Sequence, residues 1–338
     1  MDDRLSEFVQ QLKKKKLDGF IVTNPINIFY LSGFRGVSPA EREAVLIISP
    51  RRATLITARL YQHEARKLAL KSLSVKITAE RDQIPTLIQK ILKNAQKVGF
   101  EENDLRFGEY QEFKRVLTKS IPFKNLIEDL RIIKSEEEIT RIEKAQIISQ
   151  RAFWALVKTI KIGQTETEIA QKLATIIKDL GGHGLAFESI VACGSNSSRP
   201  HYVTGNQKVK KGQVLLLDFG AKYKDYCADL SRTIFIGRAT DPHKNIYTHV
   251  HSAQKKAISK ITAGSKAKEI YHYAKKVFKA QKLDKYFIHG LGHGIGLEVH
   301  EKPHLRPAST RQLASRRSGS SLGEPNIDET ILRAWSSP

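Results

Sequence analysis

The stretch that decides the fold reads QVLLLDFGAKYKDYCADLSRTIFIG and covers residues 213–237. Its apolar run at 214–217 suits a buried strand, which delivers Asp218 at its end. The following KYKDYCADLSRT alternates as an antiparallel return strand does, and a hairpin about Lys222–Asp225 would bring Asp218 and Asp229 to one face. Because two like charges brought together need a cation between them, this hairpin predicts a metal site.

A histidine follows in the glycine-rich stretch HGLGHGIG (289–296), where His293 has glycines on both sides. Glycines remove side-chain bulk and permit positive φ, which suits a backbone that approaches a site closely. With Asp218 and Asp229, His293 supplies two carboxylates and an imidazole, a mixture suited to manganese, cobalt, iron or zinc. The three residues together indicate a hydrolase. Taken alone, Asp218 would be paired with a cation or exposed at its strand end, and a lone histidine would more often be structural.

Length and composition limit the other classes of protein. A chain of 338 residues with 40% apolar residues can form two domains. The N-terminus is charged throughout, no apolar run approaches the roughly 18 residues of a membrane span, and neither Cys193 nor Cys227 belongs to a CxxC motif. We therefore expect a cytoplasmic chain with no membrane partner. The net charge of +22 comes from lysines scattered along amphipathic helices, which favours a solvated basic surface over a nucleic-acid partner.

The periodicity of apolar residues changes near residue 130 and indicates a domain boundary there. An apolar stripe of helical period and several strand-like segments fill the first part, which is typical of an α/β module. Ser135 and Glu138 then form a capping-box pattern that opens a long helix. The later helix-like and strand-like segments are grouped rather than alternating, which indicates α+β. We expect domains at 1–130 and 131–307, followed by a divergent tail at 308–338.

Three blocks carry a resemblance to a known family: PHYVTG (200–205), LLLDFGAKYKDYCADLSRTIFIG (215–237) and HGLGHGIGLEVHEKP (289–303). They are similar to the signature blocks of the Xaa-Pro peptidases, the family of aminopeptidase P, prolidase and creatinase. LDGFIVTNPINIFYLSGF (17–34) also resembles the N-terminal domain of that family. The resemblance covers about residues 1–307. It implies an α+β chain, with an N-terminal α/β creatinase-type domain followed by a pita-bread catalytic domain, in which helix pairs cover a curved antiparallel sheet.

The resemblance also implies a two-metal site and its ligands. Asp218, Asp229 and His293 would bind two divalent metal ions, with manganese expected first and cobalt, zinc or iron as alternatives. A metal-activated hydroxide would be the nucleophile. Three further histidines would bind substrate, stabilise the transition state and move protons; they are His201, His289 and His300. His201 follows Pro200 and could equally be a loop residue.

The activity implied by the resemblance is cleavage at proline. An Xaa-Pro bond lacks the N–H that strand-like peptide recognition uses, so it calls for a dedicated site. We expect an Xaa-Pro aminopeptidase, which releases the N-terminal residue from Xaa-Pro peptides. The alternative is an Xaa-Pro dipeptidase, or prolidase, and only substrate length separates the two. The family also makes a homodimer the expected assembly.

The C-terminal tail departs from the family pattern. The family completes its metal site with two glutamates, one in an EPGIY-like strand and one in a final strand. After Pro307 this chain is rich in serine and arginine, has no lysine, and offers only Glu324 and Glu329. We expect the last strands of the sheet to be missing through an altered C-terminus. A catalytically silent homologue that acts as a peptide-binding module is therefore a second expectation, of a different class.

Overall fold

The fold divides into two compact units, Met1–Leu130 and Arg131–Pro338. A computed structural model describes residues 2–36, 42, 44–68, 72–80, 82–117, 119–309, 311 and 313. Glu324 and Glu329, and with them most of the expected tail, lie outside the described residues. None of the helices in the described part of the chain is both long and apolar enough to cross a membrane.

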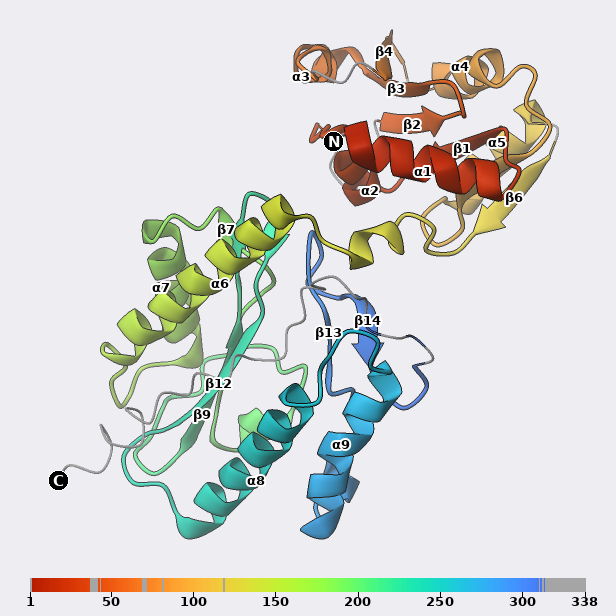
Figure 1. Cartoon of the computed structure of the whole chain (residues 1–338). Coiled ribbons are helices and arrows are strands. Elements are labelled where there is room, and N and C mark those ends of the chain that lie inside the picture. The colour runs from red at the N-terminus through yellow and green to blue at the C-terminus, as the bar shows by residue number, and fades with distance from the viewer. Residues whose placement is uncertain are drawn as a thin grey trace. The chain divides into compact units, whose positions relative to one another are not determined.

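Unit 1 is built on a mixed six-stranded sheet in the order β4-β3-β2-β1-β5-β6 (Figure 1). The central β1 pairs antiparallel with β2 and parallel with β5. Every residue of these three strands is buried, which explains why β1 and β2 read as continuous apolar runs rather than alternating ones. The strands are β1 (Gly19–Val22), β2 (Ala44–Ile48), β3 (Ala53–Ala58), β4 (Leu73–Thr78), β5 (Val98–Glu101) and β6 (Ser120–Phe123).

Helices contribute apolar side chains to the core of unit 1. The ring of Phe8 on α1 meets that of Phe20 on β1 edge to face, with 5.2 Å between centroids. Ile84 and Ile88 on α4 and Phe113 on α5 join a core cluster with residues of β1, β2, β3 and β5. The helices of this unit are α1 (Asp2–Lys14), α2 (Pro25–Ser32), α3 (Gln62–Arg66), α4 (Gln83–Ile91) and α5 (Phe107–Val116).

Two long helices open unit 2, and each begins with a capping box. Ser135 and Glu138 cap α6 (Glu136–Val157), and Thr165 and Glu168 cap α7 (Glu166–Asp179). In both boxes the hydroxyl accepts the backbone N–H of the glutamate while the glutamate accepts that of the cap residue. The capping box predicted at Ser135 is confirmed. Helices α6 and α7 lie against one another and against strands of the unit (Figure 1).

One of the two three-stranded sheets described in unit 2 has the antiparallel order β12-β9-β8. Its strands are β8 (Ile190–Cys193), β9 (Val214–Phe219) and β12 (Leu230–Phe235). Leu215, Leu217 and Phe219 on β9 are buried in the core formed with α6 and α7. Because side chains alternate along a strand, Asp218 belongs to the opposite, less buried face.

The predicted hairpin is confirmed. Beyond β9, β10 (Ala221–Tyr223) pairs with β11 (Tyr226–Cys227) in the register Tyr223↔Tyr226. Lys224 and Asp225 at the turn both have positive φ, 45° and 73°, as a two-residue hairpin of matching twist requires. Strand β10 also pairs with the short β7 (Gly184–Leu185).

The last described elements carry the glycine-rich segment. Helices α8 (Asp241–Ile258) and α9 (Ala267–Ala280) contact one another, and α9 contacts β14 (Figure 1). Strands β13 (Gly292–Gly294) and β14 (Glu301–Leu305) form a two-stranded antiparallel sheet with an irregularity at His293/Gly294. The candidate histidines of this region therefore lie on, or next to, a small sheet that follows two helices.

Candidate functional site

Asp218 is held by a hydroxyl from the neighbouring strand. Ser231 on β12 lies opposite Asp218 on β9, and its Oγ donates to Asp218 Oδ1 at 2.6 Å. Burial raises the pKa of the Asp218 carboxyl, and the charge of Asp229 raises it further, while the Ser231 hydrogen bond acts in the other direction. The site thus holds a carboxylate that is costly to ionise without a nearby cation.

Asp229 and His293, two of the predicted metal ligands, lie in direct contact with one another. His293 Nε2 lies 3.4 Å from Asp229 Oδ2, and each side chain is only 18% exposed. Nδ1 of His293 donates to the carbonyl of Gly294 at 3.0 Å, which turns Nε2 toward the carboxylate. Burial alone would lower the pKa of His293, but its contacts with Asp229 and the Gly294 carbonyl outweigh burial and raise it.

Two of the three predicted catalytic histidines lie near this pair. The rings of His293 and His300 have their centroids 4.3 Å apart. Burial lowers the pKa of His300, and the charge of His293 lowers it further. The exposed His201 interacts electrostatically with both Asp218 and His300. Residues far apart in the sequence therefore share one electrostatic environment.

The third predicted histidine lies in different surroundings. His289 is exposed, and its ring meets that of Phe287 at 5.2 Å between centroids. Its Nδ1 donates to the carbonyl of Gly290 at 2.6 Å. The structure thus places His289 with Phe287, and the described contacts do not bring it to Asp218, Asp229 or His293.

The sequence did not single out His304, which the structure brings to the cluster. In the β13–β14 pair His304 lies directly opposite His293, so both side chains share one face. Burial lowers the pKa of His304, as do the charges of Arg306, His293 and His300. In the sequence His304 lies three residues after Glu301 in EKPH, and this spacing does not indicate a metal or catalytic site.

A second residue that the sequence did not single out organises the loop of His201. Glu166, at the start of α7, is completely buried. Its Oε1 accepts from Cys193 N at 2.7 Å and from Asn196 Nδ2 at 3.1 Å. Its Oε2 accepts from Tyr202 Oη at 2.7 Å and from Gly205 N at 3.3 Å. One carboxylate therefore fixes both ends of the segment that contains His201.

The donor set fits a divalent metal in kind. A carboxylate oxygen of Asp229 and an imidazole nitrogen of His293, 3.4 Å apart, are donors of the kind that divalent metal ions bind. A ligating histidine commonly donates its other N–H to a backbone carbonyl, as His293 does to Gly294. In number the fit is incomplete, because the described residues contain no group of three histidine, cysteine or acidic side chains placed to hold an ion.

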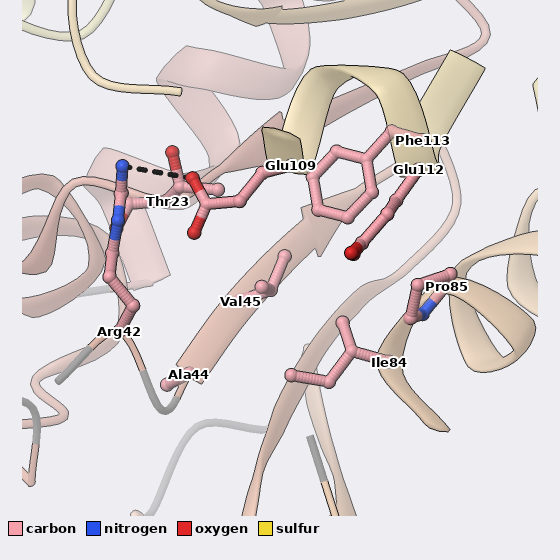
Figure 2. A pocket seen from close by; sticks show the side chains of 9 residues that line it. All are labelled: Thr23, Arg42, Ala44, Val45, Ile84, Pro85, Glu109, Glu112 and Phe113. Carbon is pink, nitrogen blue, oxygen red and sulfur yellow. Dashed lines mark hydrogen bonds and ion pairs between the residues drawn. The ribbon is translucent and has the colours of Figure 1, made fainter. Parts of the chain in front are cut away.

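A separate hollow lies in unit 1 and contains none of the predicted site residues. Figure 2 shows its lining, in which the buried Arg42 points toward Glu109. Nη2 of Arg42 lies 3.1 Å from Glu109 Oε2, so this guanidinium already has a carboxylate partner. The remaining lining residues are Thr23, Ala44, Val45, Ile84, Pro85, Glu112 and Phe113.

Comparison with known proteins defines the class of the chain as a peptidase. Residues 140–318 match "Metallopeptidase family M24", and residues 4–133 match "Creatinase/Prolidase N-terminal domain". An Xaa-Pro dipeptidase of Pyrococcus furiosus is 34% identical over 90% of this chain and 85% of its own length. The chain belongs to metallopeptidase family M24.

Solved structures agree with this assignment. An Xaa-Pro dipeptidase from Bacillus anthracis has a TM-score of 0.87 and 32% identity, covering 93% of this chain and 87% of its own. An X-Pro aminopeptidase from Thermotoga maritima has a TM-score of 0.80 and 30% identity, covering 90% and 87%. The creatinase-type N-terminal domain and the pita-bread domain expected from the sequence are confirmed.

Proposed function

We propose that this chain is an Xaa-Pro dipeptidase that hydrolyses the bond between a first residue and proline. The observation that carries the proposal is the contact between Asp229 and His293, beside Asp218 and His300, in a chain of metallopeptidase family M24. Dipeptidases among its relatives favour this function over the aminopeptidase activity that we expected first. Because the X-Pro aminopeptidase from Thermotoga maritima is also similar, aminopeptidase activity on longer peptides is the competing alternative.

The proposal includes two divalent metal ions, with manganese first and cobalt, zinc or iron as alternatives. Asp218, Asp229 and His293 would hold them, because two carboxylates and an imidazole suit these ions. When bound, such ions lower the pKa of a bound water and polarise the carbonyl that is attacked. Ser231 would keep the Asp218 carboxylate oriented, and the carbonyl of Gly294 would keep Nε2 of His293 turned inward.

The histidines around the metal ligands would transfer protons and contact the substrate. The lowered pKa of His300 leaves a neutral imidazole near neutral pH, which can accept a proton or donate a hydrogen bond. His201 is exposed on a loop that Glu166 anchors, a position suited to contact with substrate. We propose His289 only as a peripheral substrate contact, because its ring contacts Phe287.

The test is hydrolysis by the purified chain with added manganese. An Xaa-Pro dipeptide and an Xaa-Pro-Xaa tripeptide are compared at equal concentration, with Asp229→Ala as the blank and Glu143→Gln, an exposed change on α6, as the matched control. We expect turnover of the dipeptide in wild type and control and none in the blank. Preferential turnover of the tripeptide would overturn the dipeptidase assignment in favour of an aminopeptidase.

A second candidate function follows from the incomplete ligand set. Because the described residues contain no three-ligand group, a catalytically silent homologue that binds Xaa-Pro peptides is the alternative. Absence of turnover from protein shown by circular dichroism to be folded would favour it. Calorimetric titration with the same dipeptide would then detect binding without hydrolysis.

A further inference from the structure

A cluster of buried charges lies where unit 2 begins. Arg131, Lys134 and Glu301 are only 3%, 5% and 8% exposed. Arg131 Nη2 contacts Glu301 Oε1, and Lys134 Nζ lies 3.0 Å from Glu301 Oε2. Arg131 Nη2 also lies 2.8 Å from Glu298 Oε2. Because removing charges from water is costly, these ion pairs add little net stability.

The carboxylate of Glu301 also closes a tight turn. Its Oε1 accepts from the backbone N–H of Glu298 at 3.2 Å. A Cβ added to Gly296 would lie 2.5 Å from Glu301 Oε2, so only glycine leaves space for this carboxylate. Burial tends to raise the pKa of Glu301, but the charges of Arg131 and Lys134 outweigh burial and lower it. The acid is therefore held as an anion inside the turn.

The same turn lies against the strand that leads to Asp229. Cys227 N donates to the carbonyl of Gly296 at 2.7 Å, and Cys227 Sγ lies 3.6 Å from the carbonyl oxygen of Leu297. His300 immediately precedes Glu301, and His293 lies at the other end of the turn segment. The cluster thus fixes the segment that joins the two histidines, next to the strand that leads to the aspartate.

The start of α6 holds that strand from its other side. Tyr226 Oη donates to Glu138 Oε1 at 2.9 Å, and Glu138 is the capping-box residue of Ser135. One short stretch, 131–138, therefore contacts both parts of the candidate site. It reaches the aspartate strand through Glu138, and the histidine turn through Arg131 and Lys134.

We propose that Arg131, Lys134 and Glu301 form a positioning clamp, which sets the separation between Asp229 and His293 and the place of His300. These three residues do not touch substrate; they act through the turn at 296–301. The catalytic part of this inference rests on the proposed dipeptidase function. Its structural part concerns only the packing of the turn on Cys227 and can be tested without substrate.

The two cysteines of the chain provide the structural test. Both are buried, and burial raises the pKa of the Cys193 thiol to about 12 and that of Cys227 to about 11. Only Cys227 contacts the turn, whereas Cys193 belongs to the core with α6 and α7. The experiment measures alkylation of each thiol by N-ethylmaleimide, followed by peptide mapping, in wild type and in Lys134→Met.

We expect Lys134→Met to raise the labelling rate of Cys227 by at least about tenfold while that of Cys193 stays unchanged. Lys134→Arg, which keeps the charge, should restore protection. A matched control, Asp104→Asn, disturbs the buried Arg42 of unit 1 and should leave both rates unchanged. An equal rise at both cysteines, or no rise at Cys227, would overturn the clamp.

A milder variant covers the case in which Lys134→Met does not fold. Glu298→Gln removes the half-exposed member of the cluster, and we expect labelling of Cys227, but not of Cys193, to rise about threefold.

An activity measurement tests the catalytic part of the inference. Lys134→Met should lower kcat for the dipeptide about tenfold or more with little change in KM, and Lys134→Arg should recover kcat. Wild-type protein without turnover would refute the dipeptidase function, while the thiol result would still judge the clamp. A normal kcat in Lys134→Met would overturn the catalytic part.

Discussion

His293 Nε2 lies 3.4 Å from Asp229 Oδ2, and this contact raises the pKa of His293 against the effect of burial. A divalent ion at this nitrogen must displace a proton, so we predict that manganese affinity increases with pH, by about tenfold per pH unit below that pKa. Calorimetric titration with manganese across a pH series measures the slope. His293→Ala should reduce the slope and leave only the part that comes from Asp218, and His272→Ala, an exposed change on α9, should keep the wild-type slope. A flat profile in wild type would exclude His293 as a ligand.

Ser231→Ala should weaken the site through Asp218. Burial and Asp229 raise the pKa of the Asp218 carboxyl, and the hydroxyl of Ser231 is the largest influence that lowers it, so loss of this hydroxyl raises that pKa further. We expect manganese affinity at neutral pH to fall about tenfold or more, and its pH dependence to move to higher pH. Ser231→Thr keeps the hydroxyl and should behave like wild type. Equal affinities in Ser231→Ala and wild type would show that the hydrogen bond does not tune the site.

Glu166→Gln should loosen the segment that contains His201. The change replaces one acceptor oxygen with a donor that faces the backbone N–H of Cys193 or of Gly205, at a cost of about 2–3 kcal/mol. Burial works to raise the pKa of Glu166, but its hydrogen bonds outweigh burial and lower it. The stabilisation is therefore present above the ordinary pKa of glutamate and is lost as the pH falls through the folded value.

Urea unfolding near neutral pH compares this variant with Glu143→Gln, an exposed change that should stay within about 0.5 kcal/mol of wild type. The dipeptide KM should rise in Glu166→Gln alone. A variant as stable as wild type, with the same KM, would contradict the anchoring role of Glu166.

Glu101 in unit 1 should make stability depend on pH in the opposite sense. Burial raises its pKa from 4.5 to about 8, against hydrogen bonds from Asn24, Asn27 and Thr23. The folded state then binds a proton that the unfolded state releases, so the free energy of unfolding falls as the pH rises from about 4.5 to about 8, by at most about 1.4 kcal/mol per pH unit.

Urea unfolding followed by a probe in unit 1 tests this dependence. Glu101→Gln should flatten it, because the amide carries no charge at any pH. Glu102→Gln, at the exposed neighbouring position, should keep the wild-type slope. The same slope in Glu101→Gln and wild type would rule out Glu101 as its source.

Gly220→Ala should disrupt the hairpin at the candidate site. A Cβ at this position would lie 1.8 Å from the carbonyl oxygen of Ala228, next to Asp229, so the two backbone segments would have to move apart. We expect a loss of about 3 kcal/mol or more in the free energy of unfolding. Gly108→Ala, which meets nothing within 4 Å on helix α5, should be neutral or slightly stabilising. Thermal unfolding of the two variants measures the contrast.

The sequence predicted elements whose signal is local. The capping box at Ser135, the hairpin around Lys224 and most strands of unit 1 follow from periods and turn residues a few positions apart. Helix α2 was missed because PINIFYLS is apolar without a clear period, although Asn24 as the cap and Pro25 as the first helical residue are signals of a helix start. Strand β6 was missed because it is short, lies at the sheet edge and contains Pro122.

The candidate site was predictable only in part, because only some of its residues are brought together by local pairing. Asp218 and Asp229 share one hairpin, so their proximity follows from local pairing. His304 becomes a neighbour of His293 only through the register of β13 with β14. The contact between Arg131 and Glu301 joins residues 170 positions apart, which no pattern within either segment reveals. His289 was assigned to the site by the family resemblance, and the structure places its ring against that of Phe287.

That long-range contact has a consequence for how the chain acquires its site. During synthesis, Arg131 and Lys134 leave the ribosome long before Glu301 exists, so neither cation can pair with this carboxylate until then. Contacts between residues so far apart in the sequence form late, because closing a long loop costs entropy that only the contact itself then offsets. Because the chain is synthesised from its N-terminus, we expect the clamp to form among the last steps of folding. A nascent chain that stops before β14 would carry Asp218 and Asp229 without the turn that aligns them.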